Sequence, residues 1–104
     1  MAKYYVRWQL NPQLIPLNPE ERNKLWSPLL KLVKEDIKAG KIKDWGAVAG
    51  ETCGYAIREE SSEAELHAAN LKWIPYVSFE ANPVLTCDQL VELTQKALAA
   101  AKAK

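Results

Sequence analysis

Apolar and polar residues alternate from Lys3 to Leu10, which predicts a β-strand with one face on a core. Its covered face is expected to hold Tyr4, Val6, Trp8 and Leu10, and its other face Tyr5, Arg7 and Gln9. Two prolines between Asn11 and Leu17 indicate that the next residues are irregular.

A different pattern, with apolar residues three or four positions apart, predicts a helix from Asn18 to about Ala39. Asn18 can cap this helix and Pro19 fits its first position. Its stripe facing the sheet is expected to be Leu25, Trp26, Leu29, Leu30, Val33 and Ile37. Pro28 removes one backbone hydrogen bond inside the helix and is expected to kink it. Gly40 is a natural C-terminal cap.

Two strands follow, at 41–49 and 54–60, and fold back on each other near Gly50. In the later strand we expect the open face to carry Gly54, Ala56 and Arg58, with Tyr55 and Ile57 turned to the helices. In the earlier strand the direction stays open, because one face would hold Ile42 and Val48 and the other Trp45, Ala47 and Ala49.

The rest of the chain predicts a helix, a strand and a helix. Ser62 to Glu65 has the form of a capping box, and Pro75 ends the helix that it opens. The buried stripe of that helix is expected to be Leu66, Ala69, Trp73 and Ile74. Tyr76 to Asn82 alternates again, and Pro83 restricts this strand to an edge or an end. A last helix opens at Thr86, with an apolar side formed by Leu90, Val91, Leu93, Ala97 and Leu98.

The resulting order, β-α-β-β-α-β plus a terminal helix, predicts an α+β fold: a ferredoxin-like two-layer sandwich in a single domain spanning 1–104. Right-handed crossovers place two helices on one face of a four-stranded antiparallel sheet. The other face would carry aromatic and small residues in water, which is unfavourable. We therefore expect a homodimer in which two such faces pack together into a dimeric α+β barrel.

Composition and charge exclude several classes of protein. The chain has 104 residues and a formal net charge of +1, with no basic stripe, so nucleic acid is not an expected partner. It has neither a signal-peptide pattern nor an apolar run of about 20 residues, so we expect a cytoplasmic protein without a membrane partner. Cys53, Cys87 and His67 are too few for a zinc site, and no phosphate-binding glycine motif occurs, so no cofactor is expected.

Three stretches carry a resemblance to a known group of proteins: IKDWG from Ile42, GYAI from Gly54, and WIPYVSFE from Trp73, followed by Pro83-Val84-Leu85. The chain resembles a small uncharacterised family of the dimeric α+β-barrel superfamily, near the muconolactone-isomerase-like proteins. The resemblance implies the fold and a dimer. The superfamily includes lactone isomerases, cofactor-independent monooxygenases and haem-degrading enzymes, but no catalytic motif of theirs maps onto this sequence.

Candidate catalytic residues are Arg7, Arg58, Glu80 and His67. The two guanidinium groups could converge on the open face to hold a carboxylate or enolate, with Glu80 as a general base. The alternative is that Glu80 forms an ion pair with one of the arginines. His67 could be a base or, as in the haem-degrading relatives, an axial haem ligand; the alternative is a surface histidine.

Candidate ligand-binding residues are Tyr5, Trp45, Tyr55 and Tyr76, which could form the walls of an aromatic pocket. They could equally be core or interface residues. The sequence thus supports two functions. One is binding, isomerising or oxidising a small carboxylate or aromatic molecule in a cleft at the sheet. The other is a non-catalytic dimerisation module.

Overall fold

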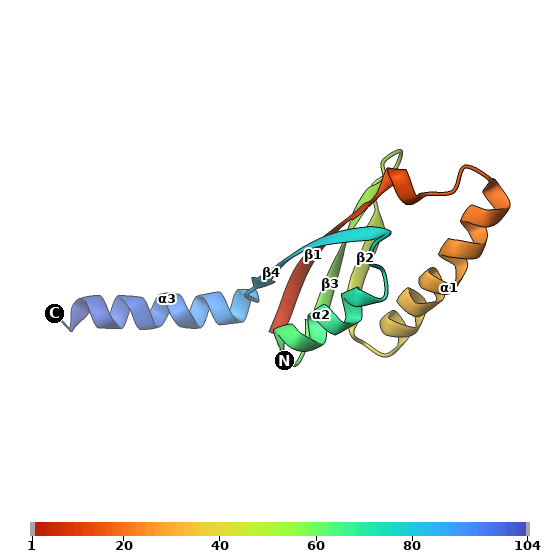
Figure 1. Ribbon diagram of the computed structural model, residues 1–104. Helices are drawn as coiled ribbons and strands as arrows, with labels where there is room; N and C mark the ends of the chain where they lie inside the picture. The colour runs from red at the N-terminus through yellow and green to blue at the C-terminus, as the bar shows by residue number, and fades with distance from the viewer. Residues whose placement is uncertain (1, 104) are drawn as a thin grey trace.

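The computed structural model describes residues 2–103 as an antiparallel sheet with three α-helices (Figure 1). The elements are β1 (Ala2–Leu10), a short 3-10 turn (Pro12–Leu14), α1 (Pro19–Lys38), β2 (Ile42–Ala47), β3 (Cys53–Glu60), α2 (Glu63–Leu71), β4 (Val77–Val84) and α3 (Cys87–Lys102). The predicted α+β fold with a four-stranded antiparallel sheet is confirmed, and every predicted helix and strand is present.

The strands lie in the order β2-β3-β1-β4, with every neighbouring pair antiparallel. β4 is therefore an edge strand, as Pro83 predicted, since proline cannot donate a hydrogen bond to a further strand. The core lies on one face of the sheet, where Tyr4, Val6 and Ala56 pack against Leu66 of α2. α1 and α2 both lie over this face, because both contribute walls to the same cavity above Val6.

The helix ends follow the predicted capping chemistry. The Asn18 side chain accepts hydrogen bonds from the backbone N–H groups of Glu20 and Glu21, at 2.8 and 3.3 Å. α1 continues through Pro28, and Gly40 follows it with φ of 80°, the left-handed conformation that glycine adopts without steric cost. At α3 the capping box is complete, because the Thr86 hydroxyl and the Gln89 side chain satisfy each other's backbone N–H.

The face assignment of β3 was wrong. Directly opposed residues of antiparallel strands share a face, and Ala56 is opposite Val6, which is only 1% exposed. The helix-covered face therefore holds Gly54, Ala56 and Arg58, and the open face Tyr55 and Ile57. The prediction assumed that the larger apolar side chains of β3 would be buried. Instead its small residues are buried, because tryptophans of the neighbouring strands fill the space above them.

A register shift settles the direction of β2, which the sequence left open. Ile42 pairs with Arg58 and Asp44 pairs with Ile57, so Lys43 is the extra residue of a bulge. The bulge places both Ile42 and Trp45 on the covered face, although they are three positions apart. A regular strand would have placed them on opposite faces.

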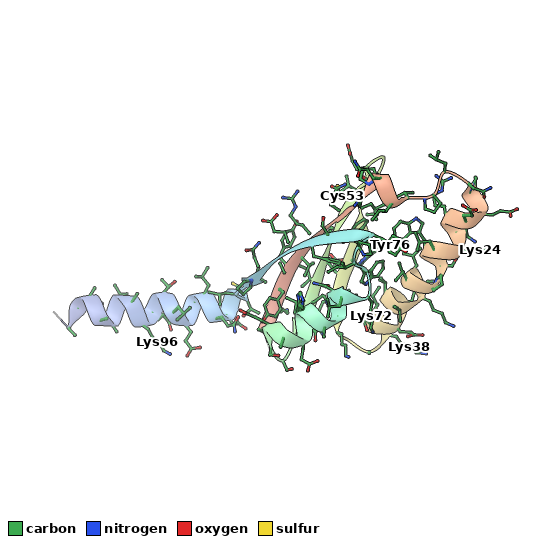
Figure 2. All side chains as sticks on the ribbon, in the orientation of Figure 1. Lys24, Lys38, Cys53, Lys72, Tyr76 and Lys96 are labelled. Carbon is green, nitrogen blue, oxygen red and sulfur yellow. The ribbon has the colours of Figure 1, made fainter. Side chains whose placement is uncertain are left out.

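α3 extends away from the rest of the molecule (Figure 1), and the longest dimension of the protein is 66 Å. Every residue of this helix is exposed, including its predicted apolar side. Figure 2 shows its side chains, among them Lys96, surrounded by no other element. Within residues 2–103, no helix has the length and apolar character needed to cross a membrane.

Candidate functional site

The four tryptophans of the chain line one cleft between α1 and the covered face of the sheet. Trp8 comes from β1, Trp26 from α1, Trp45 from β2 and Trp73 from the turn after α2. We call this space the tryptophan cleft; its volume is about 400 Å³. Its remaining walls are Leu10, Leu30, Ala47, Glu51, Val77 and Phe79. Among these described residues only Glu51 is charged, so the cleft is apolar and aromatic.

The rear wall of the cleft is a stacked pair of indoles. The ring centroids of Trp8 and Trp45 are 5.4 Å apart with an interplanar angle of 15°. These residues come from strands on either side of β3, and they can meet because β3 carries only Gly54 and Ala56 opposite them. A Cβ at Gly54 would clash with the Trp8 ring and with the Gly46 carbonyl oxygen. The small residues Gly54 and Ala56 of β3 therefore leave the space in which the two indole rings stack.

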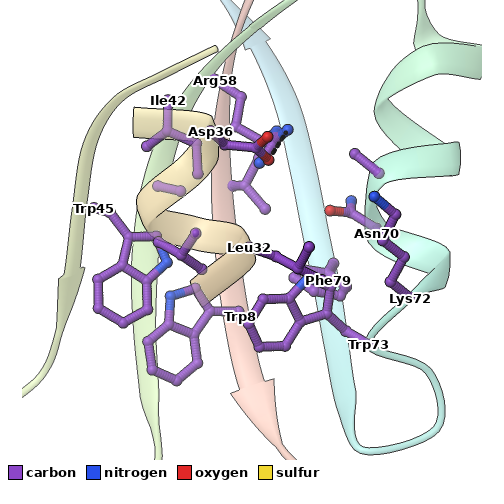
Figure 3. Close-up of a pocket in the computed structure, with 14 residues that line it drawn as sticks. Trp8, Leu32, Asp36, Ile42, Trp45, Arg58, Asn70, Lys72, Trp73 and Phe79 are labelled. Carbon is purple, nitrogen blue, oxygen red and sulfur yellow. Dashed lines mark hydrogen bonds and ion pairs between the residues drawn. The ribbon is translucent and has the colours of Figure 1, made fainter. Parts of the chain in front are cut away.

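One buried polar atom in this wall has no partner. The Nε1–H of Trp8 is buried and makes no hydrogen bond within the described structure. An indole N–H can only donate, and buried donors are normally satisfied. The Trp8 ring lines both the tryptophan cleft and the polar cavity described next, but its Nε1–H is enclosed and lies beside Trp45 (Figure 3).

A smaller cavity of about 40 Å³ continues from the tryptophan cleft (Figure 3). It shares with the cleft the side chains of Trp8, Trp45, Trp73 and Phe79, and adds Asp36, Arg58, Asn70 and Lys72 as polar groups. We call it the polar end. Figure 3 shows Arg58 and Asp36 on one side of it and Asn70 and Lys72 on the other.

Arg58 is held by two carboxylates on the covered side of the sheet. Its Nη2 lies 3.0 Å from Asp36 Oδ2 and 2.9 Å from Glu60 Oε1, and its Nε donates to the same Glu60 oxygen at 3.2 Å. The side chains of Arg58 and Glu60 are only 9% and 8% exposed, whereas Asp36 is 32% exposed. This network ties the end of α1 to β3 and fixes the guanidinium beside the polar end.

The open face of the sheet holds a separate set of candidates. Arg7 and Glu80 are direct partners in the β1–β4 register, but no ion pair joins them among the described residues. The Tyr55 hydroxyl donates to Asp44 Oδ2 at 2.9 Å. This hydrogen bond, with some burial and the negative charge of Asp44, raises the pKa of Tyr55 above its ordinary value. Tyr5 lies on the same face two residues before Arg7, opposite Ile57 of β3, and is partly exposed.

The sequence-based candidates thus separate into three places. Arg7, Glu80, Tyr5 and Tyr55 lie on the open face, so Arg58 does not converge with Arg7 and Glu80; that expectation was wrong. Arg58 and Trp45 line the polar end on the covered face.

The remaining two candidates lie elsewhere. His67 is exposed on α2 and lines an outer groove against β4. Tyr76 lies in the turn before β4 rather than in the strand, and it lines none of the cavities described here.

Trp8, Trp26 and Trp73 were not among the predicted ligand-binding residues. The sequence pattern assigns each of them to a buried stripe. Their side chains do point toward the layer between helices and sheet, but the pattern does not show that this layer contains an open space. A partial signal was present, because three separate segments each place one tryptophan toward the layer between helices and sheet, although the direction of Trp45 stayed open. Among residues 2–103 no group of three His, Cys, Asp or Glu side chains could hold a metal ion.

Comparison with family models identifies a domain that spans most of the chain. The model described as a domain of unknown function, DUF3303, matches residues 2–98. The chain belongs to this family. The match covers all four strands, α1, α2 and most of α3, so the tryptophan cleft lies entirely within the DUF3303 domain. The description of the family assigns no activity. A search of curated proteins finds no match to the chain.

Proposed function

We propose that this protein binds a small, planar and largely apolar molecule in the tryptophan cleft. The observation that carries the proposal is the convergence of all four tryptophans on one open space of about 400 Å³. Ligand sites are commonly concave, about 300–1,000 Å³ in volume and lined by aromatic side chains. A core built only for stability would fill this space, since protein interiors are close-packed.

The shape of the cleft favours a flat ligand. Trp8 and Trp45 already stack on each other, and Trp73 and Phe79 close the opposite side (Figure 3). A planar ring placed between these walls would gain offset-stacked or edge-to-face contacts. We restrict the proposal to binding, because Arg7 and Glu80 lie on the other face of the sheet and His67 lines a different groove.

The order of the elements supports a finer assignment of the fold. Two β-α-β units joined by a hairpin, with strand order β2-β3-β1-β4, are typical of the ferredoxin-like sandwich. We propose, with this order as support, that the chain is related to the dimeric α+β-barrel proteins, near the muconolactone-isomerase-like group that the sequence resembles.

Calorimetric titration with 2-naphthamide, a neutral planar probe, tests the binding proposal. We expect saturable binding at one site per chain, abolished or weakened at least tenfold by Trp73→Ala, which removes one wall. Tyr55→Phe is the matched control, because Tyr55 is aromatic and lies on the opposite face. Absence of heat with the native protein, or equal weakening by both variants, would remove the proposal.

We propose as a second function that the open face forms a homodimer. Tyr5 and Val84 are each 37% exposed there, beside the half-buried Ile57, so apolar surface faces water. Arg7 and Glu80 give the face both signs of charge side by side. A two-fold axis that is parallel to the face and runs between Arg7 and Glu80 would place Arg7 against Glu80 of the partner subunit and the reverse, a self-complementary arrangement.

Light scattering on Tyr5→Glu tests this second proposal. We expect the native protein to have the mass of a dimer and the variant that of a single chain, since two buried carboxylates would face each other. Leu17→Glu is the control, because Leu17 is 96% exposed and lies in the loop before α1. A native protein that is already a single chain would refute the dimer.

A further inference from the structure

We infer that α3 packs in parallel against α3 of a second copy of this chain, so that the two helices form a short coiled coil at one end of the homodimer. This inference rests on the proposed open-face dimer and adds a second contact between its subunits. Three features of the molecule support it: the direction in which α3 leaves the sheet, the distribution of residues around this helix, and the area that a stable dimer needs.

The proposed two-fold axis directs both copies of α3 toward the same end of the dimer. An axis that is parallel to the face and runs between Arg7 of β1 and Glu80 of β4 follows the strand direction. Rotation about such an axis leaves the direction of β4 unchanged. Only Leu85 and Thr86 separate β4 from α3, which continues away from the sheet beyond the end of β4 (Figure 1). The two helices therefore leave the dimer side by side.

The spacing of the two β4 strands suits direct contact between the helices. Facing sheets lie about 10 Å apart and neighbouring strands about 4.8 Å apart, so this axis places the two β4 strands about 11 Å from each other. Packed helices have axes about 8–10 Å apart. Each α3 thus begins close to the distance at which it can pack on its copy.

The residues of α3 are distributed around the helix as a parallel pair requires. At about 100° per residue, small and apolar residues with heptad spacing form one seam: Cys87, Leu90, Thr94, Ala97 and Ala101. Larger apolar side chains flank this seam: Val91, Leu93 and Leu98. The charged residues lie on the remaining side: Asp88, Glu92, Lys96 and Lys102. Pairing along the seam would cover the exposed apolar side of α3 and bury no charge.

The open-face contact alone is small for a stable dimer. With the axis between β1 and β4, these two strands face β4 and β1 of the partner subunit. Two strands paired over eight residues form a strip of about 10 Å by 26 Å, or about 500 Å² counted on both subunits. A contact of that size is typical of crystal packing, which mostly buries less than about 800 Å².

Pairing of α3 would supply the missing area. The helix has 16 residues, so it is about 24 Å long and about 10 Å wide. Its contact with a second copy would about double the area of the dimer interface, to about the 1,000 Å² that a biological interface needs. The second copy is therefore the partner whose symmetry, spacing and area fit the uncovered side of α3.

Cysteine cross-linking tests the parallel arrangement. In Cys53→Ser protein, oxidation with copper phenanthroline should join Cys87 to the partner's Cys87, since equivalent seam residues of a parallel pair lie within disulfide reach. In the variant without either native cysteine, Ala101→Cys should cross-link, whereas Ala99→Cys, on the outer side of the same turn, should not. Equal cross-linking at positions 99 and 101, or none at positions 87 and 101, would overturn the parallel pairing.

Sedimentation equilibrium over a dilution series measures the contribution of α3 to the dimer. We expect Leu90→Glu to raise the dimer dissociation constant at least about tenfold, since two carboxylates would meet in the seam. Ala99→Glu adds the same charge on the outer side of α3 and should leave the constant unchanged. If the native protein is a dimer and both variants behave alike, the α3 pairing fails while the open-face dimer stands. If the native protein is a single chain, both fail.

Discussion

Trp8 on β1 and Gly54 on β3 are direct partners in the sheet, and the Trp8 indole occupies the space that a side chain at position 54 would need. This pair explains how a small sheet can hold an aromatic wall. Because Gly54 has no side chain, the Trp8 indole of the neighbouring strand can lie across β3 and stack on Trp45.

Gly54→Ala should displace the Trp8 indole and disrupt its stacking on Trp45. We expect a loss of about 1–3 kcal/mol in the free energy of unfolding, the usual cost of overpacking. Urea denaturation measures the loss, and near-ultraviolet circular dichroism reports the stacked indoles. Gly46→Ala is the comparison, because its added Cβ would meet the Tyr55 ring on the open face; it should leave the tryptophan signal intact. An unaltered signal in Gly54→Ala would contradict the packing described here.

Arg58→Met should destabilise the fold by about 3–5 kcal/mol, because it leaves the buried carboxylate of Glu60 without its partner. The double variant Arg58→Met with Glu60→Leu should recover much of this loss, since no unpaired charge then remains in the core. Asp36 is partly exposed and can return to water. Urea denaturation of both variants checks the prediction. A double variant less stable than the single one would show that Glu60 has another role.

The hydrogen bond from Tyr55 to Asp44 should depend on pH in one direction. The pKa of Tyr55 is raised in the folded protein, so the pair stabilises the fold below about pH 10 and its contribution disappears as the pH rises through the raised pKa. Asp44→Asn should lower the pKa of Tyr55 toward its ordinary value. Carbon NMR of the tyrosine ring during a pH titration measures this shift. Asp88→Asn, on the distant α3, should leave it unchanged.

α3 should contribute little to the stability of the single chain. Every residue of this helix is exposed, so Leu90→Ser should change the free energy of unfolding by less than about 0.5 kcal/mol. Thermal unfolding at low protein concentration measures this. A larger loss, or one that grows with protein concentration, would show that the apolar side of α3 is covered by a second molecule in solution.

The order and type of the elements could be predicted because the sequence carries the relevant signals locally. Alternation marks β1 and β4, and capping residues mark the helix starts at Asn18, Ser62 and Thr86. Which residues of β3 face the helices could not be predicted, because this depends on the register of β3 with β1 and not on the pattern within β3. Which side chains of β2 face the helices depends on a bulge at Lys43, and no feature of the local sequence predicts that bulge.

The candidate site was only partly predictable for the same reason. Trp45 and Arg58 were singled out by residue type, but their placement in the walls of one cavity follows from strand pairing. Trp8, Trp26 and Trp73 were read as core, since a periodic pattern shows that a residue points inward but not whether its space is filled. The volume between α1 and the sheet is a property of the packed structure alone.

The indole N–H resonances of the four tryptophans offer the most direct test of the tryptophan cleft. In a nitrogen-labelled sample titrated with 2-naphthamide, we expect all four signals to shift and to saturate together with a single dissociation constant. Signals that stay unchanged up to millimolar ligand, or that shift without saturating, would contradict the account.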